Sequence, residues 1–260
     1  MAETPAAFDP AAVRAVAFDG YGTLFDFEHA HFSTAIARIL AEQRIETDAD
    51  AFFREWDGYY SRASVWGDRG VNRENPDRAS VLNGPLPEWH SQWEIWRRQF
   101  EWAFGQSGIE GSPEHGADQL RALLTEAEPY ADAHDTIEQL AGRGYLLGLL
   151  SNADEDFLQG ALSRGRLRFS VIQSSESLRA YKPNRAVYLA LCHRLGCEAN
   201  EVLYVGDSAI ADVNGAANAG LGAAWLRRGP NPFYPDALPA PHLTLDSLAE
   251  LLDLLAAPPA

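Results

Sequence analysis

The chain has little of what marks several classes of protein. It has two cysteines among 260 residues, Cys192 and Cys197, without the second pair that a zinc site requires. Two reduced, buried thiols are therefore expected. The apolar runs, such as residues 145–150, are far too short to span a bilayer. The N-terminal stretch has no basic segment followed by an apolar one, so no signal peptide is expected. A cytoplasmic location is therefore the expectation.

Basic residues are also scarce. The chain has 21 Lys and Arg against 37 Asp and Glu, which gives a net charge of −16. A nucleic-acid-binding protein normally presents a basic face, and nothing in this sequence offers one. An anionic substrate is not excluded, because the charge near the site decides that. Hydrophobic residues make up 46% of the chain, which is enough for a sizeable core.

Short apolar runs alternate with helical stretches through most of the chain. The runs predicted as strands are residues 13–18, 145–150, 169–173, 202–205 and 222–226, with a weaker sixth at 242–245. Helical stretches lie between them, including residues 133–143, 185–195 and 210–219. This alternation predicts an α/β fold with a parallel sheet between two layers of helices, which is a Rossmann-like core.

One long stretch interrupts this alternation. It has no convincing strand, and the spacing of its apolar residues predicts helices at 28–43, 50–62, 88–104 and 116–126, around a loop at 67–87. We therefore predict an all-helical cap domain, residues 27–127, inserted into a catalytic core made of residues 1–26 and 128–260. Hinges are expected near residues 26–27 and 128–129.

The predicted cap is rich in tryptophan. It holds six of the seven Trp residues of the chain, namely Trp56, Trp66, Trp89, Trp93, Trp96 and Trp102. Large aromatic side chains usually fill a core, so these residues are expected to pack the interior of the cap. The alternative is that one or two of them face a cleft and contact an apolar or ring-bearing substrate.

Polar residues follow the predicted strands. Asp19 ends the first strand in the run Asp-Gly-Tyr-Gly-Thr-Leu, and Ser151 with Asn152 follows the second. Lys182 precedes a proline and a helix, and Asp207 ends the fourth strand five residues before Asp212. Each has an ordinary explanation alone, as a turn, a surface lysine or a helix cap. Together they mark the carboxyl edge of a parallel sheet, where ligands bind in this architecture.

In this order and spacing, the motifs resemble the haloacid dehalogenase-like hydrolase superfamily, in its type with a small helical cap. The resemblance covers essentially the whole chain. It implies a covalent mechanism at Asp19 with one magnesium ion. It also implies a small-molecule substrate, no nucleic-acid or membrane partner, and it allows a homodimer.

The resemblance assigns a role to each motif residue. Asp19 would be the nucleophile, and Thr23 and Ser151 would hydrogen-bond the nucleophile or the reacting group. Lys182 would neutralise charge, and Asp212 would orient Lys182 or a metal-bound water. The metal ligands would be Asp19, Asp207 and the backbone carbonyl of Tyr21, with substrate contacts at Gly20, Tyr21 and Asn152.

A charge count agrees with a bound cation. Asp19, Asp207 and Asp212 bring three carboxylates to one crevice, and like charges at close range raise their pKa values. Lys182 and a divalent ion would balance them. Magnesium suits this role because it binds one or two carboxylates and keeps its other positions for water and phosphate oxygens.

Two departures from the family pattern disagree about the reaction. Tyr21 stands where phosphatases of the superfamily usually carry a second Asp, and there the sequence resembles the 2-haloacid dehalogenases. Arg54, near Tyr59 and Tyr60, resembles the arginine of their caps and is a candidate substrate contact.

The motif that contains Asp207 and Asp212 favours a phosphatase. Asp207 stands where the dehalogenases have neutral residues, and Ala209 stands where they have Asn. Because Asp207 without a cation would repel a haloacid carboxylate, we expect a magnesium-dependent phosphatase of a small phosphorylated metabolite. A metal-free 2-haloacid dehalogenase is the alternative, and a weakly catalytic binding or regulatory module is the second alternative.

Overall fold

The structure is a computed structural model, and it describes residues 8–60, 79–229, 232–256 and 258. Trp66 and residues 67–78 of the predicted loop lie outside the described residues. Among the described helices, none is long and apolar enough to cross a membrane.

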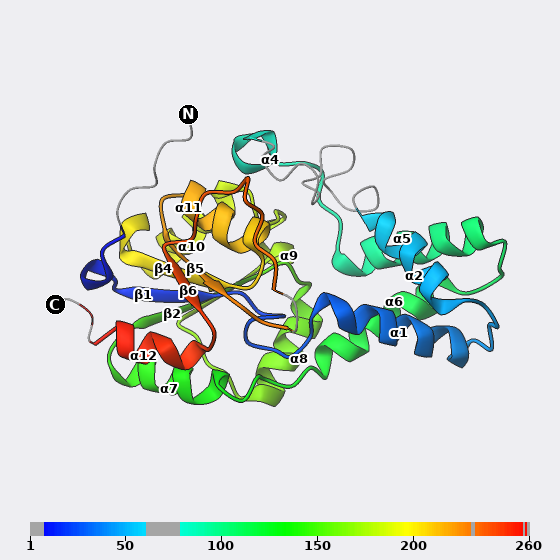
Figure 1. Ribbon diagram of the computed structural model, residues 1–260, viewed down its shortest axis with the longest axis horizontal. Helices are drawn as coiled ribbons and strands as arrows, with labels where there is room; N and C mark the ends of the chain where they lie inside the picture. The colour runs from blue at the N-terminus through cyan, green and yellow to red at the C-terminus, as the bar shows by residue number, and fades with distance from the viewer. Residues whose placement is uncertain (1–7, 61–78, 230–231, 257, 259–260) are drawn as a thin grey trace.

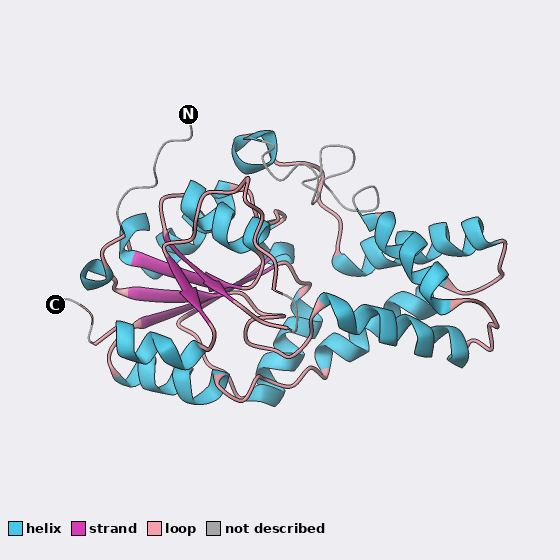
Figure 2. Cartoon of the chain, viewed as in Figure 1, coloured by secondary structure: helices cyan, strands magenta, loops and turns pink. Residues whose placement is uncertain are grey.

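The core is built on a parallel sheet of six described strands in the order β3-β2-β1-β4-β5-β6. Figure 2 shows the strands of this sheet with helices around them. The strands are β1 (Ala15–Phe18), β2 (Leu146–Ser151), β3 (Val171–Ser174), β4 (Val202–Gly206), β5 (Gly222–Leu226) and β6 (Leu243–Leu245). All predicted strands are found, with ends shifted by at most two residues. Because β1 lies between β2 and β4, the carboxyl ends of these three strands are neighbours.

Helices cover both faces of the sheet (Figure 1). Side chains alternate along a strand, so Val16 and Phe18 of β1 join one buried cluster while Ala15 and Ala17 join another. The first cluster includes residues of α7 (Ala133–Gly142) and α12 (Leu251–Leu254), and the second includes residues of α10 (Arg185–Leu195) and α11 (Gly215–Asn218). The predicted Rossmann-like three-layer core is confirmed.

Shorter elements complete the core. These are α8 (Glu155–Gly165), α9 (Ser175–Leu178), a π-helical turn (Ala209–Asn214) and 3₁₀ turns (Pro10–Ala12, Ala199–Glu201, Leu248–Glu250). The predicted helix at 210–219 is therefore a π-helical turn that leads into the short α11. The predicted helix at 185–195 is found with the same ends.

The insert between β1 and α7 contains helices joined by loops and no strand of the sheet in its described part, and it forms a lobe beyond the carboxyl ends of the strands (Figure 1). Its helices are α1 (His29–Glu42), α2 (Ala49–Gly58), α4 (Ala79–Asn83), α5 (Gln92–Ser107) and α6 (Pro113–Thr125). Helix α5 begins later than predicted, because the Ser91 hydroxyl accepts a hydrogen bond from the N–H of Glu94 at 3.1 Å and caps the helix there. The helical cap is confirmed, whereas its exact boundaries and hinges stay predictions.

The apolar interior of the lobe is continuous with that of the core. Phe52 and Phe100 of the cap belong to the same buried cluster as Phe18 of β1. The junction lies where α6 packs against α8, and there the rings of Trp96 and Phe157 are 5.5 Å apart. Opening the lobe as a rigid body would therefore expose apolar surface.

Candidate active site

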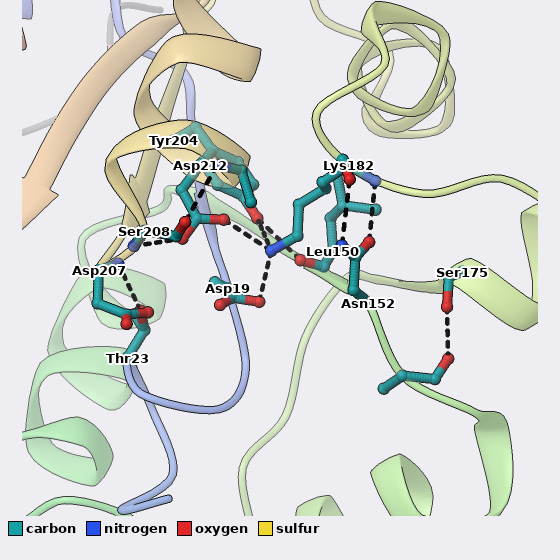
Figure 3. Close-up of polar contacts among 12 residues, drawn as sticks. Asp19, Thr23, Leu150, Asn152, Ser175, Lys182, Tyr204, Asp207, Ser208 and Asp212 are labelled. Carbon is teal, nitrogen blue, oxygen red and sulfur yellow. Dashed lines mark hydrogen bonds and ion pairs between the residues drawn. The ribbon is translucent and has the colours of Figure 1, made fainter. Parts of the chain in front are cut away.

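Four of the predicted site residues meet at the carboxyl edge of the sheet. Asp19 follows β1 and its N–H donates to the carbonyl of Val205 at 3.0 Å, which holds the start of the loop against β4. Ser151 ends β2, Asp207 follows β4, and Lys182 comes from the loop between α9 and α10. Figure 3 shows the carboxylate of Asp19 and the amine of Lys182 pointing toward each other.

Lys182 lies between two carboxylates. Its Nζ is 2.6 Å from Oδ1 of Asp19 and 2.7 Å from Oδ1 of Asp212, and it also donates to the hydroxyl of Tyr204 at 3.2 Å. Lys182 and Asp212 are almost fully buried. Burial alone would lower the pKa of Lys182, but the charges of Asp19 and Asp212 outweigh it and raise the pKa. The two carboxylates therefore favour the protonated, positively charged form of Lys182.

Asp212 is held on its other oxygen as well. The N–H of Ser208 donates to Oδ2 of Asp212 at 2.9 Å (Figure 3). Burial and the charge of Asp19 raise the pKa of Asp212 to about 6. The contact with Lys182 agrees with one of the two roles predicted for Asp212, that of orienting the lysine.

Asp207 lies against the loop that carries Asp19. Gly22 has a φ of +84° there, and a Cβ at this position would come within 2.7 Å of the Asp207 carboxylate, so only glycine fits. The hydroxyl of Thr23 donates to Oδ1 of Asp207 and accepts from its N–H, both at 3.1 Å. In this arrangement Thr23 bonds Asp207 and not the nucleophile. Burial, and then the charges of Asp212 and Asp19, raise the pKa of Asp207 well above its ordinary value.

The carboxylates of Asp19, Asp207 and Asp212 each place an oxygen within 4.8 Å of the other two. A set of oxygen donors at this spacing fits a hard cation such as magnesium. Magnesium remains a prediction, and so does the backbone carbonyl of Tyr21 as a further ligand.

The side chain of Tyr21 is not free to replace the second Asp that phosphatases of the superfamily usually carry at this position. Its hydroxyl donates to the backbone carbonyls of Leu124, at 3.0 Å, and Phe157, at 3.3 Å, which ties α6 to α8. Burial raises the pKa of Tyr21 further above its ordinary value, with smaller contributions from Asp156 and Asp19. The side chain therefore forms a wall of the site, and its hydroxyl is occupied away from Asp19.

The backbone beside Asp19 offers free donors. No hydrogen bond joins the N–H groups of Gly20, Tyr21 or Asn152 to another described residue. The side chain of Ser151 lies against Gly20, where an added Cβ would come within 2.9 Å of its hydroxyl oxygen. Such donors around a crevice can hold an anionic group.

Asn152 has a second role that the sequence did not indicate. Its Oδ1 accepts from the N–H of Lys182 at 2.9 Å, and its Nδ2 donates to the carbonyl of Lys182 at 3.2 Å (Figure 3). These two bonds fix the backbone of the lysine loop. Tyr204, which was also not singled out from the sequence, supports Lys182 and donates to the carbonyl of Leu150 at 2.8 Å. Its position on a buried strand gave no signal for this role.

Arg54 lies apart from these residues. It is on α2 and is exposed, and it is not among the residues that line the cavity above the site. Its neighbours Trp56 and Asp57 on the same helix do line that cavity. The resemblance of Arg54 to a substrate-binding arginine therefore finds no support in this geometry.

The cap is tied to the core near the lysine loop, through contacts that sequence reasoning missed. Asp154 accepts hydrogen bonds from the N–H groups of Gln92, at 2.8 Å, and Trp93, at 3.0 Å. A carboxylate of the core therefore binds the first N–H groups of helix α5, which belongs to the inserted lobe. The hydroxyl of Tyr181 donates to the carbonyl of His90 at 2.5 Å. The place of Asp154, two residues after Asn152, is the only sequence signal for this contact.

Comparison with known proteins adds relatives of two kinds. The chain is 28% identical to (S)-2-haloacid dehalogenase 4A of Burkholderia cepacia over 94% of this chain and 96% of that protein. A crystal structure of a dehalogenase with an intermediate complex superposes with a TM-score of 0.68 at 27% identity, over 94% of this chain and 98% of that one. Phosphoglycolate phosphatase 1 of Pseudomonas aeruginosa is 34% identical, but over 55% of this chain and 58% of that protein.

These matches contradict the expectation of a magnesium-dependent phosphatase. The dehalogenase matches extend along nearly the whole of both chains, cap included, whereas the phosphoglycolate phosphatase match covers about half. The expectation rested on an ionised Asp207 that only a cation could compensate. In the structure Asp207 is partly buried beside Asp19 and Asp212, and desolvation together with their charges raises its pKa, which weakens that premise.

A match to a family model shows the family of this chain. Residues 13–220 match the model of the haloacid dehalogenase-like hydrolases, which spans β1, the helical insert and the sheet as far as the end of α11. The chain belongs to the haloacid dehalogenase-like hydrolase family.

Proposed function

We propose that this chain hydrolyses the carbon–halogen bond of a 2-haloacid through a covalent ester of Asp19. The observation that carries the proposal is the similarity to an (S)-2-haloacid dehalogenase over 94% of the chain. The chemistry of position 21 adds independent support. A phosphate ester must expel an alkoxide and gains from a general acid, whereas a halide leaves as a stable anion without a proton. The occupied hydroxyl of Tyr21 is therefore no handicap for dehalogenation.

In the first step, a carboxylate oxygen of Asp19 attacks C2 of the substrate, and the halide leaves with the bonding electrons. Oδ1 of Asp19 is paired with Lys182 at 2.6 Å, so Oδ2 is the attacking oxygen. The N–H groups of Gly20, Tyr21 and Asn152, with the hydroxyl of Ser151, receive the substrate carboxylate. Their fixed positions orient C2 toward Asp19.

In the second step, water attacks the carbonyl carbon of the Asp19 ester and releases a 2-hydroxy acid. Asp212 is placed to take the proton of that water, since its carboxylate lies within 4.8 Å of that of Asp19. The bond at C2 is broken only in the first step, so the product has the inverted configuration. The net reaction consumes one water and releases a halide ion and a proton.

Halide release from each enantiomer of 2-bromopropionate tests the proposal. The wild type should release bromide from one enantiomer and form the inverted 2-hydroxypropionate. Asp19→Asn should lose at least about a thousandfold in kcat because an amide is a poor nucleophile. Asp26→Asn is the matched control, since Asp26 is exposed and lies seven residues further on. Bromide release by Asp19→Asn at the rate of the control, with deamidation excluded by mass spectrometry, would remove Asp19 from the role of nucleophile.

A homodimer and a cytoplasmic location enter none of these steps and stay predictions.

A further inference from the structure

A cavity of about 360 Å³ opens directly onto the site. Tyr21, Asn152 and Asp207 border it on the core side. The cap contributes walls that are mainly aromatic, and the rings concerned are Phe27, Phe32, Trp56 and Trp96. Leu124 of α6 adds an aliphatic side chain. A substrate held at Asp19 would project its substituent toward these walls.

The rings hold one another in place. The centroid of Phe32 is 5.0 Å from that of Phe27, 5.4 Å from that of Trp56 and 6.5 Å from that of Trp96. Trp56 and Trp96 are each 3% exposed, so neither swings freely. The cavity is therefore held open by packed aromatic side chains, and a ligand need not displace any of them.

The cavity is large for a small haloacid. An engineered apolar cavity of about 150 Å³ is enough to bind benzene, and this cavity has more than twice that volume. The methyl group of a 2-halopropionate would leave most of the aromatic wall in contact with water. A ring-bearing substituent would cover it, and the gain from that burial grows with the apolar area covered.

The polar groups of the cavity exclude a second anionic group on the substrate. Its described lining contains no lysine and no arginine. His29 lines it, but its Nε2 lies 2.8 Å from Oδ1 of Asp57, so the imidazole already has an acidic partner. The other polar side chains of the lining, apart from the two aspartates, are the neutral hydroxyls of Tyr60 and Ser208 and the neutral amides of Gln92 and Asn152.

We propose that the substrate is a monoanionic 2-haloacid with an aryl-sized apolar substituent, received by Phe32, Trp56 and Trp96. This inference rests on the proposed dehalogenase function and names its substrate class. Trp56 and Trp96 pack the interior of the cap, as expected for the tryptophans, and the same two rings also line the cavity.

Two bromoacids with the same reacting centre test the inference. The wild type should show a kcat/KM for 2-bromo-3-phenylpropionate at least about tenfold higher than for 2-bromopropionate, since a single methylene in an apolar pocket already gives about that factor. Trp96→Leu should reduce this ratio about tenfold or more. Trp93→Leu is the matched control on the same helix, because Trp93 does not line the cavity, and it should keep the ratio.

The outcomes separate this inference from the proposed function. Bromide release from 2-bromopropionate with a ratio near or below one would overturn the inference and leave dehalogenation standing. If neither acid releases bromide, dehalogenation fails, and calorimetry on the full chain then decides the inference. Binding of 3-phenylpropionate at least about tenfold tighter than propionate would support an aryl-acid cavity, and equal binding would overturn it.

Discussion

Replacement of Asp154 by Asn should make the stability of this protein depend on pH in a defined direction. Asp154 is buried, with 5% of its surface exposed, and burial raises its pKa to about 6. The N–H groups of Trp93 and Gln92 act against this change, because hydrogen bonds to a carboxylate lower its pKa, while the charges of Glu176 and Asp156 act with it. The carboxylate is therefore less stable in the folded protein than in the unfolded chain.

The sign follows from the order in which the two states take up a proton. With a native pKa of about 6 and an ordinary value of 3.8, the folded protein binds the proton first as the pH falls. Wild type should therefore gain stability relative to Asp154→Asn below about pH 6, and the gain should be complete below about pH 3.8. A pKa difference of about 2 corresponds to about 3 kcal/mol in full, and to about 0.8 kcal/mol between about pH 8 and pH 5.5.

Urea denaturation of both proteins, followed by circular dichroism at several pH values, measures this difference. The sequence pI of about 4.8 makes pH 5.5 a practical lower limit for solubility. Subtracting the variant cancels the titration of Asp212, which both proteins retain. Asp50→Asn is the matched control, since Asp50 is exposed and lies in the first turn of another cap helix, α2.

The result that would refute this reasoning is equally definite. If wild type loses stability relative to Asp154→Asn as the pH falls, the two N–H groups of α5 outweigh burial and the pKa of Asp154 is depressed. A difference that stays constant with pH would mean that the native and unfolded pKa values are equal. In either case, the view that α5 is capped by a poorly solvated carboxylate would be wrong.

Three further predictions concern the site itself. Lys182→Met should lower the free energy of unfolding by about 3–5 kcal/mol and abolish halide release, because it leaves Asp19 and Asp212 without their shared cation; unchanged urea denaturation would contradict the ion-pair geometry. Magnesium should raise the melting temperature of wild type but not of Asp207→Asn. It should also slow halide release, because a metal ion bound to the Asp19 carboxylate would make that carboxylate a weaker nucleophile. Halide release that requires magnesium would contradict the proposed mechanism. Arg54→Ala should change kcat/KM less than twofold, since Arg54 is exposed outside the cavity; a tenfold loss would restore its predicted contact with substrate.

Much of the fold could be predicted because it rests on short-range patterns. Apolar runs separated by helical stretches specify a parallel sheet with helices on both faces, and the strands were found within two residues of their predicted ends. The carboxyl ends of neighbouring parallel strands must share one edge, so the meeting of Asp19, Ser151 and Asp207 followed from the same pattern. The motif order was sufficient for the family.

The limits of helices were less predictable where a side chain decided them. The capping hydroxyl of Ser91 begins α5 later than the apolar spacing suggested. The glycine-rich and alanine-rich stretch after Asp207 begins as a π-helical turn before it becomes α-helical. A periodicity averaged over many residues does not register such single contacts.

The sequence by itself determined the type of core, the helical cap and the set of groups around Asp19, because those depend on motif order and hydrophobic period. Only the tertiary structure decided which partner each group takes. In the folded protein the hydroxyl of Thr23 donates to Asp207, and the hydroxyl of Tyr21 donates to two backbone carbonyls. Trp56 and Trp96 line the cavity, whereas Arg54 does not. These choices depend on contacts between residues far apart in the chain, which local patterns do not encode. The raised pKa of Asp207 has the same origin, since Asp212 and Asp19 come close to it only in the folded chain.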